Sequence, residues 1–85
     1  MDKHLVGVVV NYYSKPSVAA IKVTSGSIKI GDLLKYKGHT TDFTEEVASI
    51  EMNNQPVEEA KANDLIGIKV SERVRENDKV YKVVE

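Results

Sequence analysis

The apolar positions of this chain recur in short runs, and turn-forming residues separate the runs at intervals of roughly ten residues. Within most runs apolar and polar residues alternate with the period of a β-strand, and β-branched residues are frequent. Closing such strands into one sheet would remove the exposed edges that favour aggregation. The pattern therefore predicts an all-β fold, a small closed six-stranded antiparallel β-barrel, with strands at residues 5–10, 18–24, 33–37, 43–52, 66–70 and 79–84.

Residues 26–32 place two glycines around one short alternating segment. The period of two predicts Ile28 and Ile30 on one face of a strand, with polar residues on the other. Gly26 and Gly31 can each supply the positive φ of a tight turn. The segment is thus interpreted as a corner between strands, not as a catalytic loop.

Three details refine the predicted strands. Val47 and Ile50 are both apolar but lie three residues apart, which predicts a bulge within strand 43–52. Residues 38–42 are typical of a hairpin loop. Residues 57–62 contain good helix formers but are too few for a stable helix, so we expect a turn there. No internal repeat, linker or low-complexity segment is evident.

Length and composition favour one domain, spanning residues 1–85, with a formal net charge of −1. The sequence contains no cysteine, which excludes disulfides, a thiolate nucleophile and a zinc–thiolate cluster. The first residues are followed by too few apolar positions for a signal peptide or a membrane span. We therefore expect a soluble cytoplasmic protein that does not bind a membrane.

Five segments in order resemble the β-barrel second domain of translational GTPases such as elongation factor Tu. Three of them match its "V-K-V-G-D", "V-x-x-V-E-M" and "A-G-D-x-V-G-L" motifs, although Asn63 stands where the family has glycine. Asparagine tolerates a left-handed turn position better than most residues. The five segments are 17–20, 28–32, 47–52, 62–68 and 75–80.

The resemblance implies a translation-protein barrel of Greek-key type, acting as a stand-alone elongation factor-like protein. In that family the glutamate matching Glu51 packs against the terminal adenosine of aminoacyl-tRNA. Asn53 and Asn54 replace a histidine and an arginine that help to hold the RNA end. Pro16 and Ile21 replace glycines, and the branched Ile21 should crowd the aminoacyl pocket. Glu51 could equally be an ordinary exposed strand carboxylate.

Charge is distributed unevenly, with a net charge of +4 over residues 15–37 and −6 over residues 42–64. We expect a basic stripe that could follow a phosphate backbone, with modest and salt-sensitive affinity. The simpler interpretation is that these charges are the solvated outward faces of strands. The stripe consists of Lys22, Lys29, Lys35 and Lys37.

Two loops add candidate contact residues. Tyr12 and Tyr13 are adjacent, so on a strand they should point to opposite faces and at least one should be exposed. An exposed ring could stack on a base or a partner side chain, or one ring could simply cover an end of the barrel. His39 lies in the predicted 38–42 loop and is a further candidate contact.

Enzymatic chemistry is not indicated. The chain has no phosphate loop, so the match of Asp64 and Gly67 to a GTPase motif is coincidental, and we expect no nucleotide bound by this chain alone. The two histidines lack ligand spacing, so we expect no metal and no cofactor.

Two functions remain. The first is a noncatalytic module contacting tRNA, ribosomal RNA or a translation-associated protein. The alternative is a protein-interaction adaptor, or a detached accessory domain of a larger enzyme outside translation, with an enzyme as its partner protein. Binding to RNA should weaken steeply with salt, whereas an apolar protein contact should not.

Overall fold

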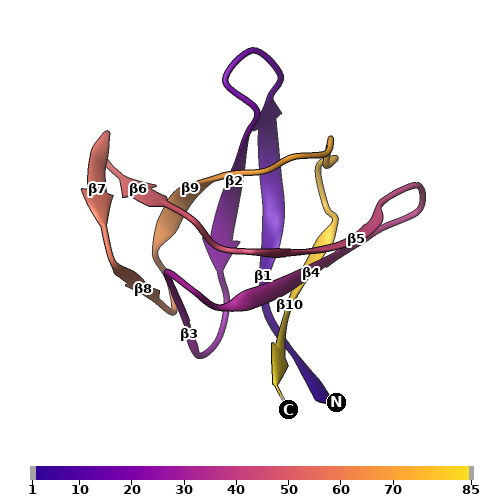
Figure 1. Ribbon diagram of the computed structural model, residues 1–85, viewed down its shortest axis with the longest axis horizontal. Coiled ribbons are helices and arrows are strands. Elements are labelled where there is room, and N and C mark those ends of the chain that lie inside the picture. The colour runs from indigo at the N-terminus through magenta and orange to yellow at the C-terminus, as the bar shows by residue number, and fades with distance from the viewer. Residues whose placement is uncertain (1, 85) are drawn as a thin grey trace.

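A computed structural model describes residues 2–84, so the two terminal residues of the predicted domain lie outside the described range. The described residues form strands and turns, and none of them forms a helix long and apolar enough to cross a membrane. Asp2 pairs with Val84, so the two ends of the described residues lie side by side (Figure 1). The strands are β1 (Asp2–Tyr13), β2 (Val18–Val23), β3 (Ser27–Lys29), β4 (Leu33–Lys37), β5 (Asp42–Glu46), β6 (Ile50–Met52), β7 (Gln55–Val57), β8 (Glu59–Lys61), β9 (Leu65–Lys69) and β10 (Lys79–Val84).

Every strand pair in the described chain is antiparallel. Eight strands form one sheet in the order β5-β4-β10-β1-β2-β9-β6-β7, and β3 pairs with β8 in a second sheet. The all-β antiparallel class is therefore confirmed. The predicted turn at residues 57–62 contains the short strand β8 and, as expected, no helix.

The closed six-stranded barrel is not confirmed, because the large sheet has eight strands and no ladder between described residues joins β5 to β7. The predicted strand 43–52 is also wrong as a single bulged strand. It divides into β5, which pairs with β4, and β6, which pairs with β9. Residues 47–49 link β5 and β6, which lie far apart in the strand order of the large sheet. Bulges occur instead in β1, between Leu5 and Gly7 and between Val9 and Asn11.

The predicted corner at residues 26–32 forms, with φ values of 66° at Gly26 and 95° at Gly31. However, β3 ends at Lys29, so Ile30 lies in the turn. Ile28 is fully buried, whereas Ile30 is 46% exposed. The prediction that both isoleucines lie on one face of a strand was therefore wrong, because the turn begins one residue earlier than the alternation suggests.

Three turns have the same sequence pattern and the same hydrogen bonds, although no repeat was predicted. In each, an aspartate side chain accepts a 2.8 Å bond from the backbone N–H three residues earlier, and its own N–H donates back. The third residue has a positive φ, which defines a type II turn. These turns are Lys29–Asp32, Lys61–Asp64 and Arg75–Asp78, and they directly precede β4, β9 and β10.

Each turn also holds one buried valine through two backbone hydrogen bonds. The positive-φ residue donates to the valine carbonyl, and the valine N–H donates to the aspartate carbonyl, at 2.7 to 2.9 Å. We call each such unit a valine clamp. The pairs are Gly31 and Asp32 with Val47, Asn63 and Asp64 with Val23, and Asn77 and Asp78 with Val9.

Inward-facing positions of the curved sheet form one apolar core. On β2 the alternate residues Ala19, Ile21 and Val23 are fully buried. On β4 Leu34 and Tyr36 face inward, and the Tyr36 ring stacks on Phe43 with centroids 4.8 Å apart. Burial, followed by the charge of Glu45, raises the pKa of the Tyr36 hydroxyl.

The third clamp touches the β4–β5 hairpin. Asp78 is only 5% exposed, and a Cβ built on Gly38 would overlap its carboxylate, lying 2.6 Å from the carboxylate carbon. Gly38 is thus required by a close approach rather than by a positive φ. A larger residue at position 38 must displace the group that caps the Arg75 N–H.

We therefore expect Gly38→Ala to destabilise the fold by about 1–3 kcal/mol through overpacking. Asp78→Ala should cost about 1–3 kcal/mol, because it leaves the Arg75 N–H without its acceptor. In the double variant the new methyl group occupies the space that the carboxylate left. Urea unfolding should then show a total loss about 1 kcal/mol smaller than the sum of the single losses; strict additivity would contradict the contact.

The raised pKa of Tyr36 predicts that the protein loses stability at alkaline pH. Its folded-state pKa lies above the unfolded value of about 10, so ionisation favours the unfolded chain. The contribution of Tyr36 to the free energy of unfolding is complete below the unfolded-state pKa of about 10. Above this pKa it falls by about 1.4 kcal/mol per pH unit. Urea unfolding between pH 8 and 11.5 should show this extra slope in the wild type and in Tyr13→Phe, but not in Tyr36→Phe.

Candidate functional site

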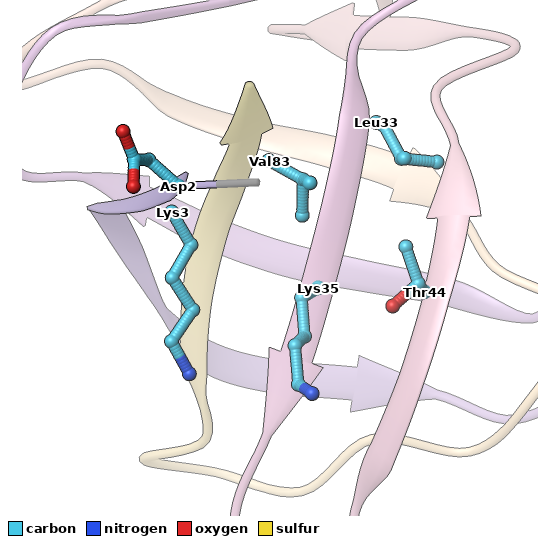
Figure 2. Close-up of a pocket in the computed structure, with 6 residues that line it drawn as sticks. All are labelled: Asp2, Lys3, Leu33, Lys35, Thr44 and Val83. Atoms are coloured by element: carbon cyan, nitrogen blue, oxygen red, sulfur yellow. The ribbon is translucent and has the colours of Figure 1, made fainter. Parts of the chain in front are cut away.

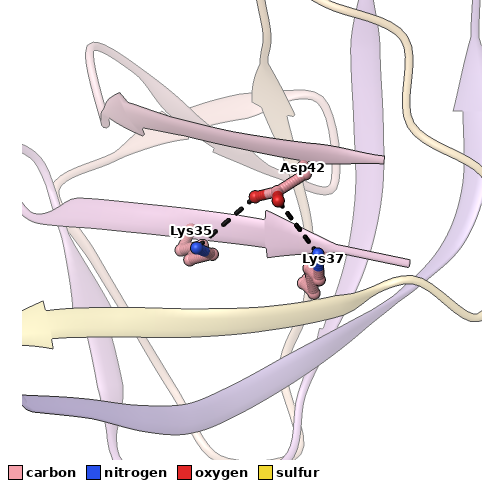
Figure 3. Close-up of polar contacts among 3 residues, drawn as sticks. All are labelled: Lys35, Lys37 and Asp42. Carbon is pink, nitrogen blue, oxygen red and sulfur yellow. Dashed lines mark hydrogen bonds and ion pairs between the residues drawn. The ribbon is translucent and has the colours of Figure 1, made fainter. Parts of the chain in front are cut away.

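The lysines of β4 are engaged by a neighbouring acid. The Lys37 ammonium lies 2.9 Å and the Lys35 ammonium 3.4 Å from different oxygens of Asp42 on β5 (Figure 3). The bond from Lys37, followed by that from Lys35, lowers the pKa of the Asp42 carboxyl. Half of the predicted basic stripe is therefore partly neutralised within the protein itself.

The predicted stripe is brought together only in part. Lys37 lies opposite Lys79 on β10, and the same cross-strand row continues through Val8 to Lys22 on β2. Lys29 belongs instead to the separate β3–β8 sheet. Lys79 was not among the predicted stripe residues, but cross-strand pairing places it beside Lys37. His39 is exposed in the β4–β5 hairpin, which forms as predicted.

An apolar hollow of about 270 Å³ lies on the outer face of the same strands. Figure 2 shows that its side chains come from β1, β10, β4 and β5. The next cross-strand row adds Leu5, which is 44% exposed, and Tyr81, whose ring lies 4.7 Å from the Lys3 ammonium. We call it the β4–β10 hollow; it is lined by Asp2, Lys3, Leu33, Lys35, Thr44 and Val83.

A second hollow, of about 410 Å³, brings Tyr13 and Glu51 together and is called the β2–β9 hollow. Tyr13 is 51% exposed, and Glu51 is exposed on β6. Asn53 and Asn54 also line it from a turn in which both have positive φ. Ile21 is fully buried in the core, so the expectation that it crowds an outer pocket was wrong.

Tyr12 lies in a third hollow, of about 330 Å³, beside the loop that precedes β10. It is half-buried against the core while Tyr13 is exposed, as the alternation predicted. The Arg73 guanidinium lies 5.9 Å from the Tyr12 ring centroid, and Arg75 Nε donates a 2.9 Å bond to Thr40. We call it the arginine hollow; it is lined by Asn11, Tyr12, Arg73, Val74, Arg75 and Glu76.

These surfaces offer apolar, aromatic and cationic contacts, which are means of binding. Among residues 2–84 no three histidine, aspartate or glutamate side chains are grouped as a metal ion would require. The predicted site residues do not converge on one point. Lys35 lines the β4–β10 hollow, Tyr13 and Glu51 the β2–β9 hollow, and Tyr12 the arginine hollow.

The curated relatives of this chain are much longer proteins. It is 43% identical over 81 residues to an uncharacterized protease of Methanocaldococcus jannaschii, covering 94% of this chain and 20% of the relative. It is 37% identical over 82 residues to a collagenase of Porphyromonas gingivalis, covering 95% of this chain and 23% of the relative. The chain thus spans about a fifth of the length of these relatives.

Solved structures share the fold at low sequence identity. The C-terminal domain of a Geobacillus thermoleovorans protein named a U32 peptidase has a TM-score of 0.87 at 17% identity, covering 94% of this chain and 92% of that domain. GDP-bound aIF5B from Aeropyrum pernix has a TM-score of 0.68 at 18% identity, covering 98% of this chain and 14% of that protein. Both likenesses concern the fold alone.

The model of the elongation factor Tu domain 4 family matches residues 2–81, in agreement with the expected relationship to translational GTPases. With the fold shared by aIF5B, this match establishes a β domain of the kind found in translational GTPases. The protease relatives, however, do not support the expected stand-alone elongation factor. Because the match spans nearly the whole chain, the protein belongs to the elongation factor Tu domain 4 family.

Proposed function

We propose that this chain is a noncatalytic accessory domain that docks onto the body of a larger, protease-related protein through the β4–β10 hollow. The observation that carries the proposal is the pattern of coverage. The relatives match nearly all of this chain with about a fifth of their own length, so the same domain accompanies a much larger body there. The proposal develops the alternative function that the sequence left open.

The β4–β10 hollow has the composition of a contact between domains. Leu33 and Val83 form its apolar floor, and the Lys3 and Lys35 side chains stand at its edge (Figure 2). Leu5 and Leu33 are 44% and 38% exposed, which leaves apolar area in water that a partner would cover. An apolar centre with a charged rim is the usual arrangement of a protein interface.

The position of this hollow also suits docking. Asp2 and Val83 line it from β1 and β10, and the start of β1 pairs with the end of β10 beside it (Figure 1). In a longer relative the attached body would lie close to this face. Interfaces between domains of one chain are small, because the linkage keeps the effective concentration high.

The translation function has less support. The β2–β9 hollow brings together Glu51, which the resemblance relates to an RNA contact, and Tyr13. However, it presents Asn53 and Asn54 at the positions where that resemblance implies a histidine and an arginine. Contact with tRNA or ribosomal RNA and a cytoplasmic location both stay predictions. The accessory role requires neither of them.

The docking can be tested with the Methanocaldococcus jannaschii protease from which the 81 matched residues have been removed. Calorimetric titration should show binding of this chain, and Leu33→Lys should weaken the binding at least about tenfold by placing a charge in the apolar contact. Leu65→Lys is the matched control, since Leu65 is 57% exposed in the β2–β9 hollow.

The domain removed from the relative serves as the positive control. If that domain binds again while this chain does not, or if both leucine variants weaken binding equally, docking through the β4–β10 hollow is excluded. Circular dichroism of each variant verifies that the fold is intact.

A further inference from the structure

Both arginines of the chain line the arginine hollow. Of twelve basic residues only Arg73 and Arg75 are arginines, and they flank Val74 in the loop before β10. Arginine presents a planar fork of N–H donors that matches an oxyanion with two parallel bonds, which lysine cannot do. Their placement in one hollow beside a tyrosine ring therefore indicates recognition of an oxyanion.

The charges of both guanidinium groups are available to a ligand. Within residues 2–84 neither arginine forms an ion pair, whereas Lys35 and Lys37 share Asp42, and Lys82 lies 3.1 Å from Asp32. Arg75 uses Nε to bond Thr40, which orients the group and leaves its terminal nitrogens for another acceptor. Arg73 is held near the face of Tyr12 by a cation–π contact.

The surroundings favour a single carboxylate over a polyanion. Glu76 lines the same hollow, so the two guanidinium charges are partly offset there. The whole chain has a formal net charge of −1, which would oppose a long phosphate backbone. A single carboxylate can accept hydrogen bonds from both guanidinium groups. A polyanion would place additional negative charge beside Glu76. A neighbouring side chain of the same ligand could rest on the apolar part of Tyr12.

We propose that the arginine hollow binds a carboxylate of a polypeptide, either an aspartate or glutamate side chain or a free C-terminus. The choice of a polypeptide rests on the proposed accessory function. The site itself is separate from the docking face, since the arginine hollow and the β4–β10 hollow share no lining residue. The domain would thus dock through one surface and hold an acidic segment on another.

The test is a nitrogen-15 NMR titration of the whole chain with three hexapeptides. The first is capped at both ends and has one central glutamate, the second has glutamine there, and the third is the glutamine peptide with a free C-terminal carboxylate. The glutamate peptide should shift the amides of residues 11–12, 40 and 73–76, with at least tenfold higher affinity than the capped glutamine peptide. The third peptide shows whether a C-terminus is also accepted.

Matched variants separate the arginine site from general charge. Arg73→Gln combined with Arg75→Gln should reduce the affinity at least tenfold, and the two Arg→Lys changes should reduce it several-fold although the charge is kept. Lys61→Gln combined with Lys69→Gln removes the same charge from exposed positions on β8 and β9 and should have no effect. Wild-type spectral dispersion establishes that each variant is folded.

Several results would overturn the proposal. One is the absence of shifts with any of the three peptides at about 10 mM, where even a weak ion-pair contact is visible. Another is equal affinity for all three peptides, which would mean that neither carboxylate is recognised. A third is an equal loss of affinity in the Lys→Gln and the Arg→Gln double variants. A ten-nucleotide oligouridylate that shifts the same amides at lower concentration would assign the site to nucleic acid instead. None of these results depends on the β4–β10 hollow, so failure here leaves the docking test unaffected.

Discussion

The fold depends on the backbone hydrogen bonds of the three valine clamps. In each clamp a positive-φ residue and the following aspartate bind both polar groups of one buried valine, so no backbone group at these core positions is left without a partner. The aspartate side chain closes the turn from the other direction. Because each turn directly precedes β4, β9 or β10, the clamps fix where these strands begin relative to the core.

The clamp at Val47 also accounts for the shape of the large sheet. Val47 lies between β5 and β6, where the chain leaves β4 and moves to β9, and its two bonds to the Gly31–Asp32 turn hold the crossing in place. This crossing makes the sheet curve around a single core, with β5 near one end of the ladder order and β6 near the other. The outward faces of four neighbouring strands then form the β4–β10 hollow (Figure 2).

Much of the fold could be predicted because the signals are local. Alternation located the main strands, and Gly31 and Asn63 adopt the left-handed conformation that their residue types favour. The errors arose where a contact between residues distant in sequence determines the local backbone conformation. Ile30 is apolar, but the turn that clamps Val47 moves it out of the strand. The side chain of Val47 is buried in the core at a residue that the turn holds, outside any strand.

The candidate surfaces were less predictable, because charge counts along the chain do not reveal which charges meet. Lys35 and Lys37 stood out as a basic stripe, but the hairpin brings Asp42 to both of them. Arg73 and Arg75, which lie among acidic neighbours in sequence, resemble a solvated loop until folding places them around Tyr12. The clamps act through the backbone and three buried valines, so they place few demands on outward side chains. A chain can therefore keep this fold at 17% identity while its surface changes, and its function must be argued from the residues that face outward.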